Sequence, residues 1–364
     1  MSTLSDWILL QRQPGVGAAT FHRLLDEHGG PAEALAALRR AGKAPVGEAD
    51  IAADLAWVER PGQHVITWDD PRYPARLREI PNPPPLLYVR GDPDLLTLPQ
   101  LAVVGSRNPS PDGRSNAREF AAHFARCGLV VTSGLALGVD GAAHEGALQA
   151  QGATVAVLGC GVDRVYPARH LELARRIVEG GGALVSELPL GTRPRREFFP
   201  ARNRIISGLA LGVLVVEAAV HSGSLITARQ AVEQGREVFA IPGSIHNPMA
   251  RGCHRLIREG AKLVETAADV LEELGPLLGL GVSSPPTAPP EAVEPADDPA
   301  LPDDPDHRAV LDALGYEPCS VDQVVARTGL KVEAVASILL VLELQGFVAS
   351  ASGGLYSRIH RRSR

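Results

Sequence analysis

A fourteen-residue stretch, Gly191 to Arg204, concentrates side chains that can bind an anion. It holds five arginines and one glutamate, and Phe198 and Phe199 stand between the basic clusters. Arginine binds phosphate by charge and by forked hydrogen bonds, and a phenylalanine can stack on an unpaired base. Two prolines and a glycine favour an irregular loop over a helix or a central strand. The stretch predicts either a phosphate- and base-binding loop or a solvated basic loop whose phenylalanines lie in the core.

Glycine and serine follow most of the strands that the sequence predicts after Leu101. Ligands of open parallel sheets bind beyond the carboxyl ends of the strands, where amides in glycine turns and at helix starts bind anions. One such turn is structural, but five on one edge beside the basic stretch predict a site for an extended anionic ligand. The turns are Gly105-Ser106-Arg107, Ser133-Gly134, Gly159-Cys160-Gly161, Ser222-Gly223-Ser224 and Pro242-Gly243-Ser244.

Nucleotide-binding and catalytic motifs are poorly matched. The sequence contains no G-x-x-x-x-G-K-[ST], which excludes a P-loop, and the nearest approach to G-x-G-x-x-G, Gly159 to Arg164, lacks its last glycine. Asp140, His144 and Glu217 are candidate acid–base residues for the crevice, but neither paired carboxylates nor metal-ligand spacing accompanies them. A solvated or structural role is favoured for each of the three. We therefore predict no catalytic residues, no cofactor and no metal site.

The elements that must position these residues alternate between strand and helix. Near-continuous apolar runs predict strands covered on both faces, and the alternation predicts an α/β fold with a doubly wound, mostly parallel extended Rossmann sheet. Strands are expected at 101–104, 129–132, 154–158, 183–186, 213–217 and 237–241. Helices are expected at 115–127, 139–151, 169–179, 203–209 and 225–234, before a strand–helix tail at 263–274.

The sheet belongs to a central domain, residues 63–275, which follows a small helical module at 1–62. Apolar residues recur at helical spacing from Leu4 to about Ile51. The turn Pro14 to Gly17 is similar to a helix-hairpin-helix, although the same residues also form ordinary helix–helix turns. Short strands are expected at 65–68 and 86–89, and six prolines between them predict an extended chain.

An acidic, proline-rich linker at 276–305 separates the central domain from a unit at 306–364. The stretch Gly275 to Asp306 holds seven acidic residues and neither lysine nor arginine, and without it the net charge changes from −6 to +1. Three helices and a hairpin, expected at 309–314, 320–328, 332–345 and 347–356, form a winged-helix pattern. Its presumed recognition helix carries one basic residue, Lys331, against Glu333 and Glu343. This composition is poor for reading DNA and leaves a protein-interaction role open.

The overall composition is that of a soluble globular protein, with 45% hydrophobic and 21% charged residues. We expect neither a membrane span nor a secretory signal. The four cysteines are far apart and predict reduced thiols in a cytoplasmic protein. Three of the 36 basic residues are lysines, so an anion site must use arginine.

Several segments together resemble one known family. They are Val104 to Arg107, Ser133 to Asp140, Phe199 to Ser207 and Ser222 to Ala228, in this order and spacing. With the entry segment from Tyr73 to Tyr88, they are similar to the DNA-processing protein A (DprA, or Smf) family. The resemblance is strong over residues 68–270 and extends more loosely to the helical module and the winged helix.

The resemblance implies a single-stranded DNA-binding protein that protects incoming strands in natural transformation and loads RecA recombinase onto them. It implies no enzymatic activity, no cofactor and a homodimer joined through the Rossmann domain, with a contact near Leu256 and Ile257. The implied DNA-binding residues are Arg107, Ser133, Gly134, Arg193, Phe199, Arg202, Asn203 and Arg204. Arg193 departs from the lysine that the family often carries, so charge is kept but geometry can differ.

Two other classes remain as alternatives. A Rossmann-type nucleotide-processing enzyme, such as a lysine-decarboxylase-like phosphoribohydrolase, would need a substrate-sized pocket with a catalytic glutamate, for which Glu217 is the candidate. A scaffold whose basic stretch binds an acidic partner is the other.

Overall fold

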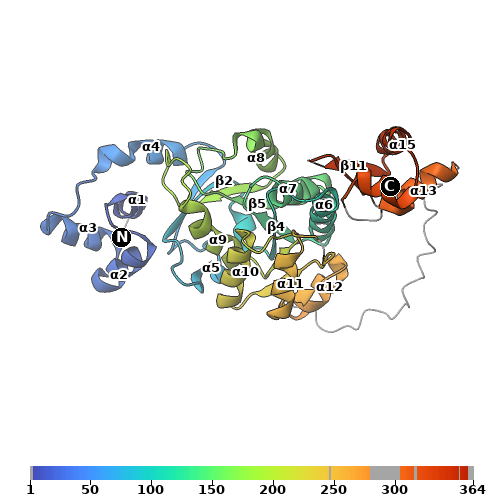
Figure 1. The fold of residues 1–364 in the computed structure, drawn as a ribbon. Coiled ribbons are helices and arrows are strands. Elements are labelled where there is room, and N and C mark those ends of the chain that lie inside the picture. Colours follow the sequence, from blue (N-terminus) through green and yellow to red (C-terminus); the bar gives the residue numbers. More distant parts are fainter. Residues whose placement is uncertain (1–2, 246, 279–303, 315–317, 352, 360–364) are drawn as a thin grey trace.

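A computed structural model describes residues 3–245, 247–278, 304–314, 318–351 and 353–359. Its centre is a nine-stranded sheet in the order β1-β2-β6-β5-β4-β3-β7-β8-β9 (Figure 1). The strands are β1 (Gln63–Thr67), β2 (Leu86–Gly91), β3 (Gln100–Val104), β4 (Val130–Ser133), β5 (Thr154–Val157), β6 (Ala183–Ser186), β7 (Gly212–Val215), β8 (Glu237–Ala240) and β9 (Lys262–Leu263). The strands from β6 to β9 are parallel, and β1 and β2 add an antiparallel edge. The doubly wound, mostly parallel sheet is confirmed.

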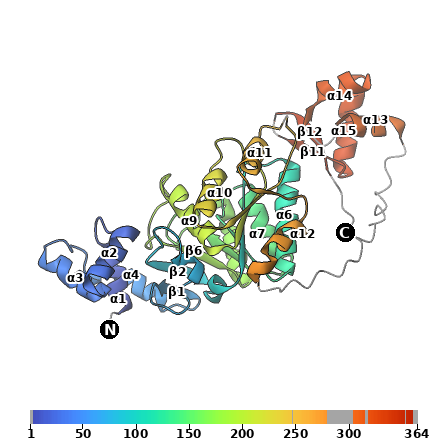
Figure 2. The same ribbon diagram turned by 90° about the horizontal axis from the view of Figure 1, so that it is seen from below.

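Helices cover both faces of this sheet. In β3, Leu101 and Val103 face one apolar cluster, whereas Ala102 and Val104 face another, as alternation along a strand requires. The first cluster lies under α6 (Pro111–Arg126), α7 (Val139–Gln149) and α12 (Ala267–Leu274). The second lies under α5 (Ala75–Arg78), α9 (Phe198–Leu209), α10 (Ser224–Glu233) and α11 (Arg251–Arg258) (Figures 1 and 2). The chain leaves β3 toward β4 on one side and returns to β7 on the other, so β3 marks the point where the winding direction changes.

The helical module consists of α1 (Leu4–Arg12), α2 (Ala18–His28), α3 (Pro31–Arg40) and α4 (Glu48–Val58). Trp7 of α1 stacks on Phe21 of α2, with ring centroids 5.5 Å apart. The module shares one apolar cluster with β1, β2 and α8 (Leu171–Glu179). Trp57 meets Tyr88 of β2 edge-on, and Trp68 meets His22 at 4.6 Å. The module is therefore packed onto the β1–β2 edge of the sheet.

Several segments differ from the sequence-based expectations. The residues between β1 and β2 include the short helix α5, so they are not extended throughout. Helix α11 follows β8 where we expected no helix. Helix α9 begins at Phe198, five residues earlier than expected, and absorbs the second half of the basic stretch. Pro200 is the third residue of α9, where its missing N–H would have had no intrahelical partner.

The C-terminal unit is a winged helix, as the sequence predicts. It contains α13 (Pro305–Leu314), α14 (Val321–Thr328), α15 (Val332–Leu344) and a sheet in the order β10 (Cys319–Ser320), β12 (Leu355–Arg358), β11 (Val348–Ala351). The side chain of Ser320 accepts a hydrogen bond from the amide of Gln323 and caps α14. Most of the predicted linker at 276–305 lies outside the described residues. No helix in the described ranges is long and apolar enough to cross a membrane.

Candidate nucleic-acid interface

A groove of about 860 Å³ opens at the carboxyl ends of the central strands. The turns after β3 and β4, the loop after β5 and the first turns of α9 and α10 form its walls. The predicted residues that line it are Arg107, Phe199, Arg202 and Asn203, and Asp140, Tyr166, Arg196, Ser222, Gly223 and Ser224 line it with them. The expectation that ligand-binding groups converge at this edge of the sheet is thus met for four of the eight predicted DNA-binding residues.

Phe199 and Tyr166 form the aromatic part of the groove. Their ring centroids are 5.5 Å apart and the rings are tilted by 44°. The guanidinium carbon of Arg107 lies 5.9 Å from the centre of the Phe199 ring, within cation–π range. A Cβ atom at Gly159 would come within 2.9 Å of the Phe199 ring, so the glycine is what allows the ring to pack there.

Arg202 forms the floor of the groove and is 5% exposed. Its guanidinium donates hydrogen bonds to the backbone carbonyls of Gly134 and Val157. Burial lowers the pKa of Arg202 to about 10, and the nearby carboxylate of Asp140 opposes that shift. Asp140 accepts hydrogen bonds from the amides of Gly134 and Ala136, while burial raises its pKa. Arg202 therefore joins the ends of β4 and β5, and its main contacts are to the protein itself.

The remaining predicted residues are distributed around this floor. Ser133 is buried and donates its hydroxyl to the carbonyl of Val103. The Arg202 guanidinium packs against the Cα of Gly134, where a Cβ atom would come within 2.5 Å of it. Arg204 pairs with Glu187 at the back of α9, and Arg193 is exposed in the loop before the helix.

Helix starts bring backbone amides to the same edge. Helix α7 follows Gly138, whose φ is 83°, a value that favours glycine. A Cβ atom at this position would also lie only 2.3 Å from the carbonyl oxygen of Ser106, so glycine is required. Helix α10 begins at Ser224, the last residue of the predicted Ser222–Ser224 turn. Helix starts carry partial positive charge, so both favour an anion in the groove.

Tyr166 and Arg196 are among the groove residues that were not predicted. Arg196 lies in the basic stretch, but composition alone could not rank it above its neighbours. Tyr166 lies six residues beyond Cys160, one of the residues that follow β5. The pattern of an aromatic residue shortly after a glycine-rich strand end was the available signal.

The candidate acid–base residues lie apart from this open groove or are engaged within its floor. His144 is fully buried, with Nδ1 2.7 Å from the hydroxyl of Thr154, and burial lowers its pKa to about 3. The Glu217 carboxylate accepts two hydrogen bonds from the amide and hydroxyl of Ser110. Within the described ranges, no group of three His, Cys, Asp or Glu side chains is arranged to hold a metal ion.

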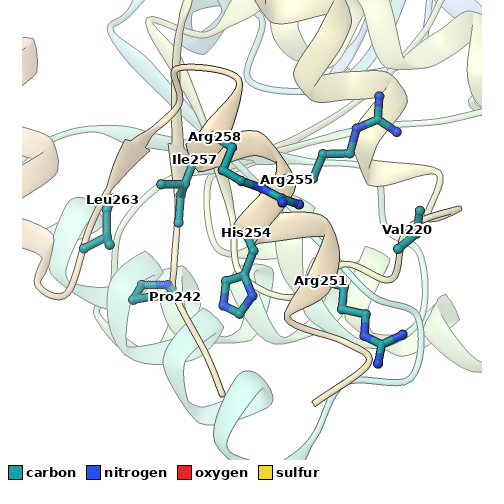
Figure 3. Close-up of a pocket in the computed structure, with 8 residues that line it drawn as sticks. All are labelled: Val220, Pro242, Arg251, His254, Arg255, Ile257, Arg258 and Leu263. Carbon is teal, nitrogen blue, oxygen red and sulfur yellow. The ribbon is translucent and has the colours of Figure 1, made fainter. Parts of the chain in front are cut away.

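A second hollow, of about 610 Å³, lies beside α11 at the opposite end of the sheet from β1 (Figure 3). Figure 3 shows Ile257, Leu263 and Pro242 on one side and the arginines of α11 on the other. Leu263 is 49% exposed and Val220 40% exposed. Of the two predicted dimer-contact residues, Ile257 lines this hollow, whereas Leu256 is buried in the core.

Family models match all three parts of the chain. Residues 64–275 match the model described as DNA recombination-mediator protein A, which covers more than half of the sequence. Residues 2–56 match a DprA-like N-terminal HHH domain, and residues 294–354 match the DprA winged helix domain.

Individual relatives agree with these matches. Protein Smf of Escherichia coli (strain K12) is 47% identical over 313 residues, which cover 85% of this chain and 81% of the relative. The X-ray structure of DNA processing protein A from Streptococcus pneumoniae superposes with a TM-score of 0.65 and 36% identity, covering 75% of this chain and 99% of that one. A Helicobacter pylori DNA processing protein A structure, reported for its single-stranded DNA binding mode, superposes with a TM-score of 0.53 at 29% identity, over 58% of this chain and 95% of that one. This chain therefore belongs to the DNA processing protein A (DprA/Smf) family.

Proposed function

We propose that this protein binds single-stranded DNA in the groove over the ends of β3, β4 and β5. In the same proposal it protects incoming single strands during natural transformation, loads RecA recombinase onto them, and catalyses no reaction itself. The observation that carries the binding proposal is one juxtaposition: Arg107 beside Phe199, next to Tyr166, at an edge where two helices begin.

The two halves of the groove suit the two halves of a nucleotide. Exposed arginines and helix starts attract phosphates without regard to sequence, and aromatic rings stack on any unpaired base. A duplex hides its base faces inside the stack, so the rings favour single strands. The exposed arginines that line the groove, Arg107 and Arg196, lie in loops and meet phosphates without regard to sequence, which supports weak sequence preference. The single-stranded DNA binding reported for the H. pylori relative supports the same assignment.

A non-catalytic role fits the state of the acid–base candidates. His144 has no open path to the groove, because its side chain is fully buried. Glu217 already accepts two hydrogen bonds from Ser110 at the start of α6. The phosphoribohydrolase alternative, which would use Glu217 as its catalytic carboxylate, gains no support from this arrangement.

Homodimerisation is proposed through the hollow beside α11. Exposed apolar side chains at Val220 and Leu263, with the partly buried Ile257 between them in the lining, give a surface that burial would stabilise, and α11 supplies arginines around them. Since β9 is a two-residue strand at the edge of the sheet, this face is open to a second copy.

The winged helix is proposed to contact protein. Leu340 and Leu344 on the outer face of α15 are 57% and 81% exposed, a poor surface for the DNA backbone. We expect removal of this unit to leave single-strand affinity largely intact.

The decisive experiment compares affinity for single-stranded and duplex oligonucleotides over a range of salt concentrations. Four arginines, Arg107, Arg193, Arg195 and Arg196, are exposed and lie in or beside the groove. If each neutralises one phosphate, the log–log salt slope is roughly −3, from about −0.7 per contact. Equal affinity for duplex, or a slope near zero, would contradict the proposal. RecA filament assembly on the bound strand, measured with and without the protein, tests the loading step.

A further inference from the structure

Tyr166 is an exposed aromatic ring in the groove that the family resemblance did not single out. It follows β5 and lines the groove beside the start of α9. The residue is 51% exposed, although a tyrosine ring is a large apolar surface that usually gains from burial. A ring held at a groove wall with half of its surface in water is available to a ligand.

The neighbouring Phe199 ring is less available. On one side Gly159 lies so close that a Cβ there would be 2.9 Å from the ring. The guanidinium carbon of Arg107 lies 5.9 Å from the centre of the Phe199 ring. The centre of the Tyr166 ring lies 5.5 Å from the same point. Phe199 is correspondingly half-buried. Phe199 therefore supports Tyr166 from behind, and a ligand meets Tyr166 with less displacement of protein atoms.

The distance between the two rings also excludes a base inserted between them in this arrangement. Atoms in van der Waals contact are about 3.5 Å apart, so a base sandwiched between two rings needs roughly 7 Å. The observed centroid distance is 5.5 Å, with the rings tilted by 44°. A base can instead lie on the open side of Tyr166, with Phe199 behind it, and Arg107 and Arg196 remain in the groove for the flanking phosphates.

We propose that Tyr166 is a base-stacking residue of this site and that its ring, backed by Phe199, takes an unpaired base of single-stranded DNA. This inference rests on the proposed function and adds a residue and a role to it. A hydroxyl contact from Tyr166 to phosphate is the competing role, and it makes different demands on the side chain.

The test measures the affinity of the full-length protein for oligo-dT and for an abasic oligonucleotide of equal length. Stacking is worth about 1–3 kcal/mol per base, which corresponds to a loss of roughly 5- to 150-fold. We expect Tyr166→Ala and Tyr166→Leu to weaken binding to oligo-dT by a factor in this range. Tyr166→Phe keeps the ring and should bind oligo-dT within about threefold of the unaltered protein. All three variants should bind the abasic strand as the unaltered protein does.

A control variant, together with the results that would contradict the proposal, distinguishes stacking on Tyr166 from single-stranded DNA binding as such. Leu171→Ala removes an apolar side chain that is 64% exposed and lies outside the groove, so it should change neither affinity. Full affinity for oligo-dT in Tyr166→Leu would overturn stacking, and a loss in Tyr166→Phe equal to that in Tyr166→Ala would assign the effect to the hydroxyl. Loss of abasic binding in every variant would show a structural role and would also overturn the inference. If the unaltered protein prefers neither single strands nor bases, the proposed function itself fails.

Discussion

The guanidinium of Arg204 donates two hydrogen bonds to the carboxylate of Glu187, at 2.5 and 2.6 Å. Both side chains are largely buried, 15% and 17% exposed. Arg204 also donates to the carbonyl of Asn82 in the entry segment. Its charge is therefore already paired in the free protein, and the side chain joins α9 to the loop after β6.

We expect Arg204→Ala to lower the free energy of unfolding by about 2 kcal/mol, because it leaves a largely buried carboxylate without its partner. Chemical denaturation measures this loss. Arg175→Ala is the matched control, since that arginine pairs with Glu172 and Glu179 on the solvent-exposed surface and should leave the free energy of unfolding nearly unchanged. Arg107→Ala should show the reverse pattern, with several-fold weaker DNA binding and unchanged stability. A stable Arg204→Ala protein would show that the ion pair contributes little.

Phe198 and Phe199 are expected to separate by function. In α9 they point about 100° apart, where extended chain would have placed them on opposite sides. Phe199 lines the groove, whereas Phe198 lies beside the guanidinium of Arg195, 6.0 Å from it. Phe199→Ala should weaken single-strand binding by about 1–3 kcal/mol, because it removes the ring that supports Tyr166 under a stacked base, and Phe198→Ala should leave the affinity unchanged. Calorimetric melting and a binding titration of both variants test this, and the opposite pattern would exchange the two roles.

Arg202 is predicted to contribute mainly to the stability of the fold and less to DNA affinity. Arg202→Ala removes the main cation beside the buried Asp140 and two hydrogen bonds to backbone carbonyls, at a cost of about 3 kcal/mol or more. Asp140→Asn in the same chain should recover part of that loss, because the amide oxygen can still accept from Gly134. A double-mutant cycle by denaturant unfolding measures the coupling. Additive losses would mean that Arg202 and Asp140 act independently.

His144 should make the protein less stable in mild acid. Its pKa is lowered to about 3 in the folded protein, chiefly by burial, against 6.5 for the ordinary group. Between these values the unfolded chain binds a proton that the folded chain does not, so stability is lost as pH falls from about 6.5 toward 3. At pH 5.5 the loss is about 1.4 kcal/mol. His144→Asn, which can still donate to Thr154, should show a shallower dependence of unfolding free energy on pH. An unchanged slope would assign the acid sensitivity to other groups.

Leu263→Arg is expected to dissociate the proposed dimer. It replaces an exposed apolar side chain with a cation beside Arg258 and Arg255, so two copies would repel each other there. Leu171→Arg is the control, since that leucine is more exposed than Leu263 but lies in α8, which contacts β5 and β6 away from β9. Light scattering coupled to size exclusion gives the mass of each variant. A dimer that survives Leu263→Arg must use another face.

The sequence was most informative where burial determines structure. The six central strands were predicted within two residues at each end, because their apolar runs are covered on both faces. The winged helix was predicted from helical spacing and a serine cap at Ser320. The predicted start of α9 was wrong because Pro200 was read as a residue that prevents a helix. Proline is tolerated in the first turn of a helix, and Pro200 lies in the first turn of α9.

The site was predicted in its location and only partly in its membership. Arg107 and Phe199 converge because the ends of parallel strands share one edge. Arg202 and Arg204 looked equivalent to the other arginines of the basic stretch, since their partners, Val157 and Glu187, lie far away in sequence. The spacing of residues in the sequence carries no information about contacts between residues so far apart along the chain. Only the three-dimensional structure therefore distinguishes an arginine that faces the groove from one that supports its floor.

The packing of the helical module also determines which part of the protein intrinsic tryptophan fluorescence reports on. All three tryptophans of the chain, Trp7, Trp57 and Trp68, lie in that module or at its junction with the sheet. Their intrinsic fluorescence will therefore report detachment of the module, as a shift of emission to the red when Trp57 leaves Tyr88. The groove holds a tyrosine and a phenylalanine and will be silent under tryptophan-selective excitation. One unlabelled sample can thus follow the motion of the module while a fluorescent oligonucleotide follows the groove.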